Sequence, residues 1–328
     1  MGFMWIGTTD GIWRADHHDA PATPVALSGH AITQLVEDRL GTAYASDGRR
    51  IWRTEDDWQN ITDSRLPDGM PVTVLAASPH PPYPLYAGSI PASLARSEDS
   101  GRSWQTLSSF DRTPGRANWT FPGASPQPRV NAIAFDAVDP AIIYATVEVG
   151  GIIRSLDGGE TWDNCSTGVN LDAHFLAAHP QQAGLIYASM GFGSGQPGGV
   201  YRSADRGETW DYCFNDRSPS YTRPIVLDAL GQDLLYVTAT PQQPPFWALP
   251  EGPGAVLWRG NCENDAWHLV FPGATADDND SSRLITALCI DPQTRGAVYV
   301  GTGDFAAALH ATGALGRPPG GPFMVGDM

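Results

Sequence analysis

Acidic side chains recur at four equivalent places along the chain, each just after an apolar segment that has an aromatic residue near its centre. They are Asp10, Asp47, Glu148 and Asp304. Carboxylates that face one shared space could supply a general acid and a general base, because crowding and burial push their pKa values apart. Acidic residues are also common in tight turns. Each is therefore a candidate catalytic residue, with a structural turn as the alternative.

A second polar set stands where other apolar segments begin. It consists of Arg129, Arg223 and Arg283, with His30, Asp172 and His174 at comparable points. Three guanidinium groups that converge would bind an anion or a carboxylate. We take His174 as a further candidate catalytic residue and the other five as candidate substrate-binding residues. The alternative for the arginines is pairing with loop carboxylates such as Asp111, Asp216 or Asp280.

Aromatic residues accompany the polar set in the longer connections, among them Trp119, Tyr221 and Trp247. An aromatic face flanked by hydrogen-bonding groups suits a sugar ring or a planar ligand. The three are candidate substrate-binding residues, and packing of the loops is the alternative. A small molecule or carbohydrate is thus the expected ligand.

Metal and cofactor motifs are weak. Residues 277–280 are rich in oxygen ligands but lack the spacing and glycine of a helix-loop-helix calcium site, and His17-His18-Asp19 fits a solvated turn. No phosphate-cradling glycine loop or paired zinc motif is present. We expect no cofactor and no metal, with calcium or another divalent cation as a minor alternative.

The elements that must position these side chains follow a nine-residue pattern. It is complete at residues 96–104, 154–162 and 202–210, and each copy keeps Ser, Asp, Gly, Ser or Thr, and Trp at fixed offsets. The Asp can accept backbone N–H bonds, the Gly can take a positive φ, and the Trp packs where the next strand begins. Each copy predicts a tight turn between two strands.

This pattern resembles the Asp-box, or bacterial neuraminidase repeat, of a superfamily of β-propellers, and the resemblance covers nearly the whole chain. The superfamily includes sialidases, xyloglucan-active glycoside hydrolases, sortilin-type receptors and a photosystem II assembly factor, so the resemblance implies fold more than function. Thr9-Asp10-Gly11 is similar to a turn that carries a catalytic Asp in xyloglucan-active relatives. The three arginines are similar to the triad of sialidases, but the chain lacks their Phe/Tyr-Arg-Ile-Pro segment.

Seven apolar segments with a central aromatic residue predict one strand in each of seven blades. They are residues 3–7, 42–46, 85–88, 142–146, 185–188, 234–237 and 297–301. Inner strands are predicted before six of them, at 31–36, 72–77, 130–135, 173–178, 224–229 and 284–290. With two outer strands per blade, the chain is predicted to be an all-β, seven-bladed propeller forming one domain, residues 1–328.

The first blade lacks a predicted inner strand. We expect residues 322–325 to provide it, so that strands from both termini close the ring and no sheet edge is left open. A three-stranded first blade is the alternative. The long connections 108–129, 191–199, 240–255 and 271–283 all fall on one face, and we expect the site at the channel mouth on that face.

Composition narrows the partners and the setting. The chain has 36 acidic and 20 basic residues, a net charge of −16, which repels nucleic acid and anionic lipid. No apolar run approaches membrane-spanning length, and no signal peptide is visible. Cys165 and Cys213 fit buried apolar positions, and Cys262 and Cys289 have no metal-like spacing. Reduced thiols and a cytoplasmic setting are therefore expected.

Two classes of function remain. One is a ligand-active propeller, glycoside hydrolase-like or another hydrolase or lyase, that acts on a sugar or an anionic small molecule with carboxylate and His/Arg chemistry. The other is a non-catalytic propeller that holds a protein partner. A narrow, charged, aromatic-lined funnel favours the first, and a broad apolar patch favours the second.

Overall fold

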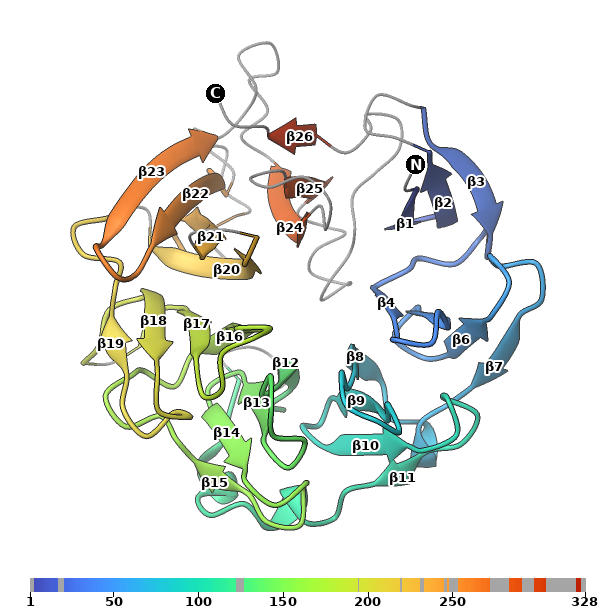
Figure 1. Cartoon of the computed structure of the whole chain (residues 1–328), viewed down its shortest axis with the longest axis horizontal. Helices are drawn as coiled ribbons and strands as arrows, with labels where there is room; N and C mark the ends of the chain where they lie inside the picture. The colour runs from blue at the N-terminus through green and yellow to red at the C-terminus, as the bar shows by residue number, and fades with distance from the viewer. Residues whose placement is uncertain are drawn as a thin grey trace.

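The structure is a computed structural model that describes residues 3–16, 21–121, 127–193, 195–218, 220–230, 233–244, 247, 253–271, 283–290, 298–304 and 323–325. These residues form seven antiparallel sheets arranged around a centre (Figure 1), so the predicted all-β, seven-bladed propeller is confirmed. The sheets are called blades I to VII here, in chain order. None of the described residues forms a helix long and apolar enough to cross a membrane.

The strands follow one another from the inner edge of each blade outward. Blade I contains β1 (Met4–Thr8), β2 (Gly11–Ala15) and β3 (Thr23–Ala26). Blade II contains β4 (Gln34–Glu37), β5 (Ala43–Ser46), β6 (Ile51–Thr54) and β7 (Thr62–Ser64). Blade III contains β8 (Val72–Ala77), β9 (Leu85–Ser89), β10 (Leu94–Ser97) and β11 (Gln105–Thr106). Blade IV contains β12 (Val130–Phe135), β13 (Ile143–Val147), β14 (Gly151–Ser155) and β15 (Asp163–Asn164).

The later blades repeat the order. Blade V contains β16 (Ala173–Ala178), β17 (Ile186–Met190), β18 (Gly199–Ser203) and β19 (Asp211–Tyr212). Blade VI contains β20 (Tyr221–Asp228), β21 (Leu234–Thr240), β22 (Val256–Asn261) and β23 (Ala266–Phe271). Blade VII contains β24 (Arg283–Ile290), β25 (Val298–Asp304) and β26 (Phe323–Val325). The elements described in full include three short 3₁₀ helices in connections, η1 (Pro67–Gly69), η2 (Phe110–Arg112) and η3 (Arg116–Asn118).

The closure of the ring differs from the prediction. The strand β26 pairs with β25, with Val298 opposite Val325 and Val300 opposite Phe323, so it is the third strand of blade VII. The described part of blade I has three strands, β1 to β3. The prediction that residues 322–325 supply the inner strand of blade I is therefore wrong, because the outer edge of β25 needed a partner as much as β1 did.

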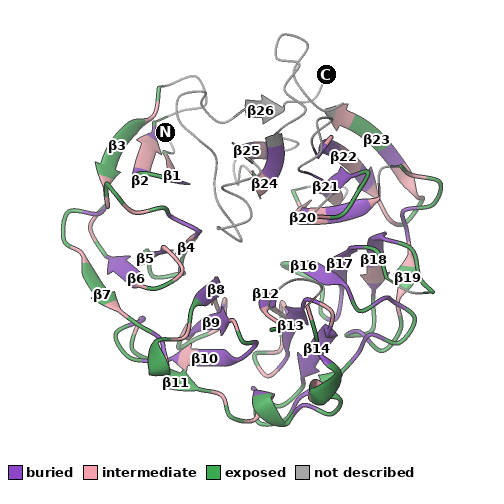
Figure 2. Cartoon of the chain, turned by 180° about the vertical axis from the view of Figure 1, so that it is seen from behind, coloured by how far each residue is buried: buried purple, intermediate pink, exposed green. Residues whose placement is uncertain are grey.

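Burial follows the blades from the centre outward. The middle strands are buried, whereas the outer strands β3, β7 and β11 expose much of their surface (Figure 2). Apolar clusters span neighbouring blades; one joins Tyr86 and Leu94 of blade III to Ile143 and Ile153 of blade IV. Packing between blades rather than within one sheet therefore makes the core.

The repeated nine-residue pattern forms the predicted turn. In blade IV, Asp157 accepts hydrogen bonds from the Thr161 N–H at 2.8 Å and from the Ser155 hydroxyl at 2.8 Å, while Gly159 donates its N–H to the Ser155 oxygen. The copies around Asp99 and Asp205 repeat these bonds. Because the side chains satisfy the turn's own backbone, their role is structural.

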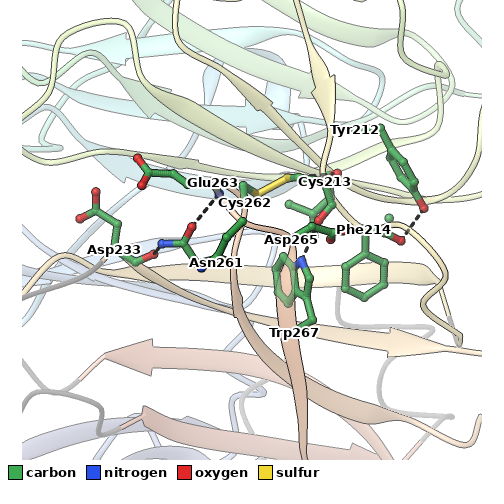
Figure 3. The surroundings of a disulfide bond; sticks show 12 residues. Tyr212, Cys213, Phe214, Asp233, Asn261, Cys262, Glu263, Asp265 and Trp267 are labelled. Carbon is green, nitrogen blue, oxygen red and sulfur yellow. Dashed lines mark hydrogen bonds between the residues drawn. A yellow bond between two sulfur atoms is a disulfide. The ribbon is translucent and has the colours of Figure 1, made fainter.

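One disulfide corrects the expectation for the cysteines. The sulfur of Cys213, just after β19, is bonded to that of Cys262, in the turn after β22, which joins blade V to blade VI (Figure 3). The expectation of reduced thiols is wrong for this pair. Disulfides persist mainly in oxidising compartments, so the cysteines no longer argue for a cytoplasmic setting. Cys165 is buried, as expected for an apolar position, and burial raises the pKa of its thiol to about 12.

Candidate functional site

Three of the predicted site residues meet at the inner edge of the ring, between blades IV and V. Glu148 follows β13, whereas Asp172 precedes β16 and His174 lies within it. The backbones of Glu148 and Asp172 form an antiparallel bridge, which brings the two blades together here. Each of the three residues offers a ligand atom within 4.8 Å of the others, and their exposed fractions are 6%, 8% and 1% in chain order. We call them the acid–histidine cluster.

A hydrogen bond to the backbone of blade VI fixes the orientation of the His174 imidazole. Its Nδ1 lies 2.5 Å from the backbone oxygen of Thr222, which can only accept, so Nδ1 carries a proton. Its Nε2 lies 3.2 Å from Oδ1 of Asp172, yet the two are not aligned for a hydrogen bond. Nε2 is buried and has no hydrogen-bond partner among the described residues. The ring of Tyr221 contacts the imidazole edge-on, with centroids 4.8 Å apart.

Glu148 is held as an anion by neighbours from its own blade. Arg129, just before β12, contacts Oε2 of Glu148 through Nη2 at 2.7 Å and Nε at 2.8 Å, and Asn131 donates to the same oxygen at 3.0 Å. Burial alone would raise the pKa of Glu148, but Arg129 and, more weakly, His174 and Arg223 lower it to about 2. Glu148 is therefore ionised at neutral pH.

A second arginine approaches from blade VI. The guanidinium carbon of Arg223, in β20, lies 5.4 Å from the centroid of the Trp247 ring. No carboxylate among the described residues lies within ion-pairing distance of Arg223. Tyr221 packs against Phe192 and Trp247, and burial followed by the Asp172 charge raises the pKa of its hydroxyl well above the usual range. Two of the three predicted arginines thus act on Glu148, and one of them is its ion-pair partner.

A glycine makes room for the cluster. A Cβ on Gly191 would lie 2.0 Å from Oδ2 of Asp172 and 2.7 Å from Cε1 of His174. Asn170 fixes this backbone, since its side chain donates to the Gly191 oxygen and accepts from the Asp172 N–H. Only a residue without a side chain fits here.

The candidates on blades I and II form local turns. Asp10 is exposed and accepts hydrogen bonds from the Gly29 N–H at 2.6 Å and the Ser28 hydroxyl at 3.1 Å, which lower its pKa. Asp47 caps two backbone N–H groups of its own turn and lies 3.3 Å from Nδ1 of His30. Neither carboxylate belongs to the acid–histidine cluster, and their contacts support the structural alternative.

The remaining candidates are packed or lie outside the described side chains. Trp119 is buried against Phe110 and so packs its loop, and Tyr221 and Trp247 are also buried. Arg283 and Asp304 are paired in the backbone register of β24 and β25, but their side chains lie outside the described part. Residues 277–280 and His17-His18-Asp19 also lie outside it.

Sequence reasoning missed Asn131, Thr222 and Gly191. A glycine placed against a carboxylate looks like any other loop glycine, and Thr222 acts through its backbone oxygen. Asn131 alone carried a signal, as a polar residue in an inner strand two positions after Arg129.

Comparison with known proteins shows relatives in fold only. No protein-family model and no curated protein matches the sequence. Among solved structures, the GH74 xyloglucanase from Xanthomonas campestris matches with a TM-score of 0.69 and 19% identity over 92% of this chain and 49% of its own. The GH74 enzyme of Niastella koreensis gives 0.56 and 16% over 82% and 40%. YCF48 from Cyanidioschyzon merolae gives 0.59 and 11% over 92% and 88%.

These solved structures differ in how much of their own length this chain matches. The chain spans about half the length of the xyloglucanase it matches. Identities below 20% establish a shared fold and carry no activity with them. The chain is a β-propeller, and its seven sheets correspond to seven blades.

Proposed function

We propose that this chain is an Asp-box propeller that binds a small anionic molecule, such as a sugar acid or a dicarboxylate, at the inner edge of the ring. There it hydrolyses the molecule or eliminates a group from it. The observation that carries the proposal is the meeting of Glu148, Asp172 and His174 from neighbouring blades beside Arg223. Buried polar groups with no structural partner are typical of functional sites.

Arg223 supports an anionic ligand. Its guanidinium group is half-buried on Trp247 and has no carboxylate partner among the described residues, whereas Arg129 is bound to Glu148. A guanidinium group held by an aromatic ring keeps its hydrogen-bonding edge for a carboxylate or phosphate. Arg223 is therefore assigned the contact with the anion.

The cluster favours chemistry other than that of a carboxylate pair. Glycosidases hold their two carboxyl groups about 6.5–9.5 Å apart when they invert and about 5–5.5 Å apart when they retain configuration, so the oxygens of Glu148 and Asp172, which lie within 4.8 Å, do not fit the inverting spacing. Glu148, with a pKa of about 2, also cannot donate a proton at neutral pH. The imidazole of His174 and the two carboxylates are instead suited to exchange a proton with the ligand or to hold an electrophile.

The experiment is a thermal-shift screen with small carboxylates and sugar acids, with the matching uncharged sugars as controls. An anion that binds the native state raises the midpoint of unfolding. Arg223→Met should weaken that anion about 10- to 150-fold, the range of a charge-assisted hydrogen bond. Arg112→Met, on an exposed loop arginine, should leave its affinity unchanged.

Anions that bind are then incubated with the protein and followed by proton NMR. Conversion by the wild type that is lost in Asp172→Asn supports an enzyme. If no anion raises the unfolding midpoint, the anion site is wrong. The second class of function, a non-catalytic propeller that holds a protein partner, then becomes the better explanation.

A further inference from the structure

The Nε2 atom of His174 lacks a suitable partner among the described residues, whether the imidazole is neutral or charged. Because Nδ1 donates to the Thr222 oxygen, a neutral ring presents a bare lone pair at Nε2, 3.2 Å from an Asp172 oxygen that is also an acceptor. A charged ring would present an N–H at Nε2, but no described acceptor is aligned with it. A buried polar atom without a partner destabilises the folded protein in either state. A third atom placed between the cluster's acceptors would remove the conflict.

The spacing of the acceptors fits a shared cation. Two ligands about 2.1 Å from a metal, with an angle of about 90–110° between them, lie about 3.0–3.4 Å apart. The Nε2 to Oδ1 distance of 3.2 Å falls within that range, and all three ligand atoms lie within 4.8 Å of one another. Atoms that share a cation also lie beside the lone-pair axis of the imidazole rather than on it. The misalignment that excludes a hydrogen bond is therefore expected for a metal ligand.

The surroundings match those of a metal-binding histidine and carboxylate. Ligating histidines usually donate their other ring N–H to a backbone oxygen or carboxylate, which fixes the tautomer. The Thr222 oxygen does this for His174. Arg129 and Asn131 both contact Oε2 of Glu148, so Oε1 accepts no hydrogen bond from a described residue and is available as a ligand. Gly191 has no side chain, so Oδ2 of Asp172 can lie against its backbone.

We propose that Glu148, Asp172 and His174 bind one divalent transition-metal cation of the Mn²⁺ or Zn²⁺ type. One imidazole nitrogen with two carboxylate oxygens suits these ions better than Ca²⁺, which prefers oxygen ligands only. Arg129 and Asn131 orient Glu148, and Thr222 orients His174. The use of this cation rests on the proposed function, since it would hold an oxygen of the anionic molecule, but its binding does not.

The test measures binding of Mn²⁺ alone. The full chain is stripped with EDTA, transferred to chelator-free buffer and titrated with MnCl₂, while free Mn²⁺ is followed by electron paramagnetic resonance and Zn²⁺ is added as a competitor. We expect one site per chain that Zn²⁺ displaces. Glu148→Gln and Asp172→Asn should each weaken Mn²⁺ at least about tenfold, because each removes a charged ligand. Circular dichroism checks that both variants fold, and Asp172→Asn serves if Glu148→Gln does not.

The matched control is Asp233→Asn. Asp233 lies 3.0 Å from Nε2 of His179, so this substitution removes the same kind of His–Asp contact between blades V and VI, away from the acid–histidine cluster. It should leave Mn²⁺ affinity unchanged. The proposal is overturned if the wild type shows no saturable Mn²⁺ or Zn²⁺ site, or if neither cluster variant weakens it. Anion binding is measured separately, with and without EDTA, so that failure of the anion site and failure of the metal site are told apart.

Discussion

The indole Nε1 of Trp267 donates a 2.6 Å hydrogen bond to the backbone oxygen of Cys213, whose sulfur is bonded to Cys262 on the blade that carries Trp267 (Figure 3). Blades V and VI are thus joined by a covalent bond and a hydrogen bond at one residue. Trp210 makes the corresponding hydrogen bond to the Cys165 oxygen at 2.8 Å, between blades IV and V. In blades V and VI, a Trp therefore ties its blade to the one before it.

Reduction of the disulfide should destabilise the protein. The bond links cysteines that are 49 positions apart in the sequence, and loop-closure entropy for that length corresponds to about 4 kcal/mol. Urea unfolding of Cys213→Ser/Cys262→Ser should show a loss of about 2–4 kcal/mol, as should the wild type under reductant. Cys289→Ser, outside the bond, is the control. Equal stability with and without reductant would contradict the pairing.

The Asp of a nine-residue turn should make the free energy of unfolding depend on pH. Hydrogen bonds from the Ser103 side chain and N–H lower the pKa of Asp99 from 3.8 to about 2. The folded pKa lies below the unfolded one, so the contribution is complete above about pH 4 and is lost as pH falls toward 2. Asp99→Asn should cost about 1 kcal/mol or less at pH 7 and almost nothing near pH 2, measured by urea unfolding. Glu160→Gln, at an exposed box position, should show no such trend.

Gly191→Ala should damage the site more than the fold. The new Cβ would lie 2.0 Å from Oδ2 of Asp172, so the carboxylate must move away from His174. Stability should fall by about 1–3 kcal/mol, while Mn²⁺ and anion binding should weaken at least about tenfold. Gly195→Ala is the control, because nothing lies within 4 Å of its Cβ position, although its positive φ adds strain. Equal effects of the two variants on binding would contradict the packing argument.

The fold could be predicted largely because its signals are local. The alternating apolar segments at 72–77, 130–135 and 173–178 coincide with β8, β12 and β16, and the box turns follow from side chains within nine residues. The pairing of β26 could not be predicted, since a three-residue apolar strand fits either open sheet edge. The disulfide was missed for a similar reason. Cys213 and Cys262 meet only through the register of two neighbouring blades.

The site could be predicted as a set of residue types but not as a geometry. Glu148, Asp172 and His174 stood out as polar residues at strand ends, yet so did Asp10 and Asp47, whose contacts prove local. What separates the groups is the bridge between the Glu148 and Asp172 backbones, which depends on how blades IV and V pack. No spacing along the chain encodes that contact.

Arg129→Met should show how much the ion pair between Arg129 and Glu148 contributes to stability. Glu148 is 6% exposed and contacts Arg129 at 2.7 Å, so the variant leaves a buried carboxylate without its ion-pair partner. Removing one partner of a buried pair costs about 3–5 kcal/mol. Arg129→Met/Glu148→Leu removes both charges and should recover much of this loss. Urea unfolding in EDTA, which keeps metal ions out of the comparison, measures both variants.

The free energy of unfolding should depend on pH differently in Arg129→Met and in the wild type. In the wild type the pKa of Glu148 is lowered from 4.5 to about 2, so its contribution is present above about pH 4.5 and is lost as pH falls toward 2. Without Arg129, the largest remaining influence is burial, which raises the pKa. A folded pKa above the unfolded one gives stability that is present at low pH and lost as pH rises. The deficit of Arg129→Met relative to the wild type should therefore be larger at pH 7 than at pH 4. A deficit that does not change with pH would show that Arg129 stabilises the blade by packing on Phe121 rather than by its charge.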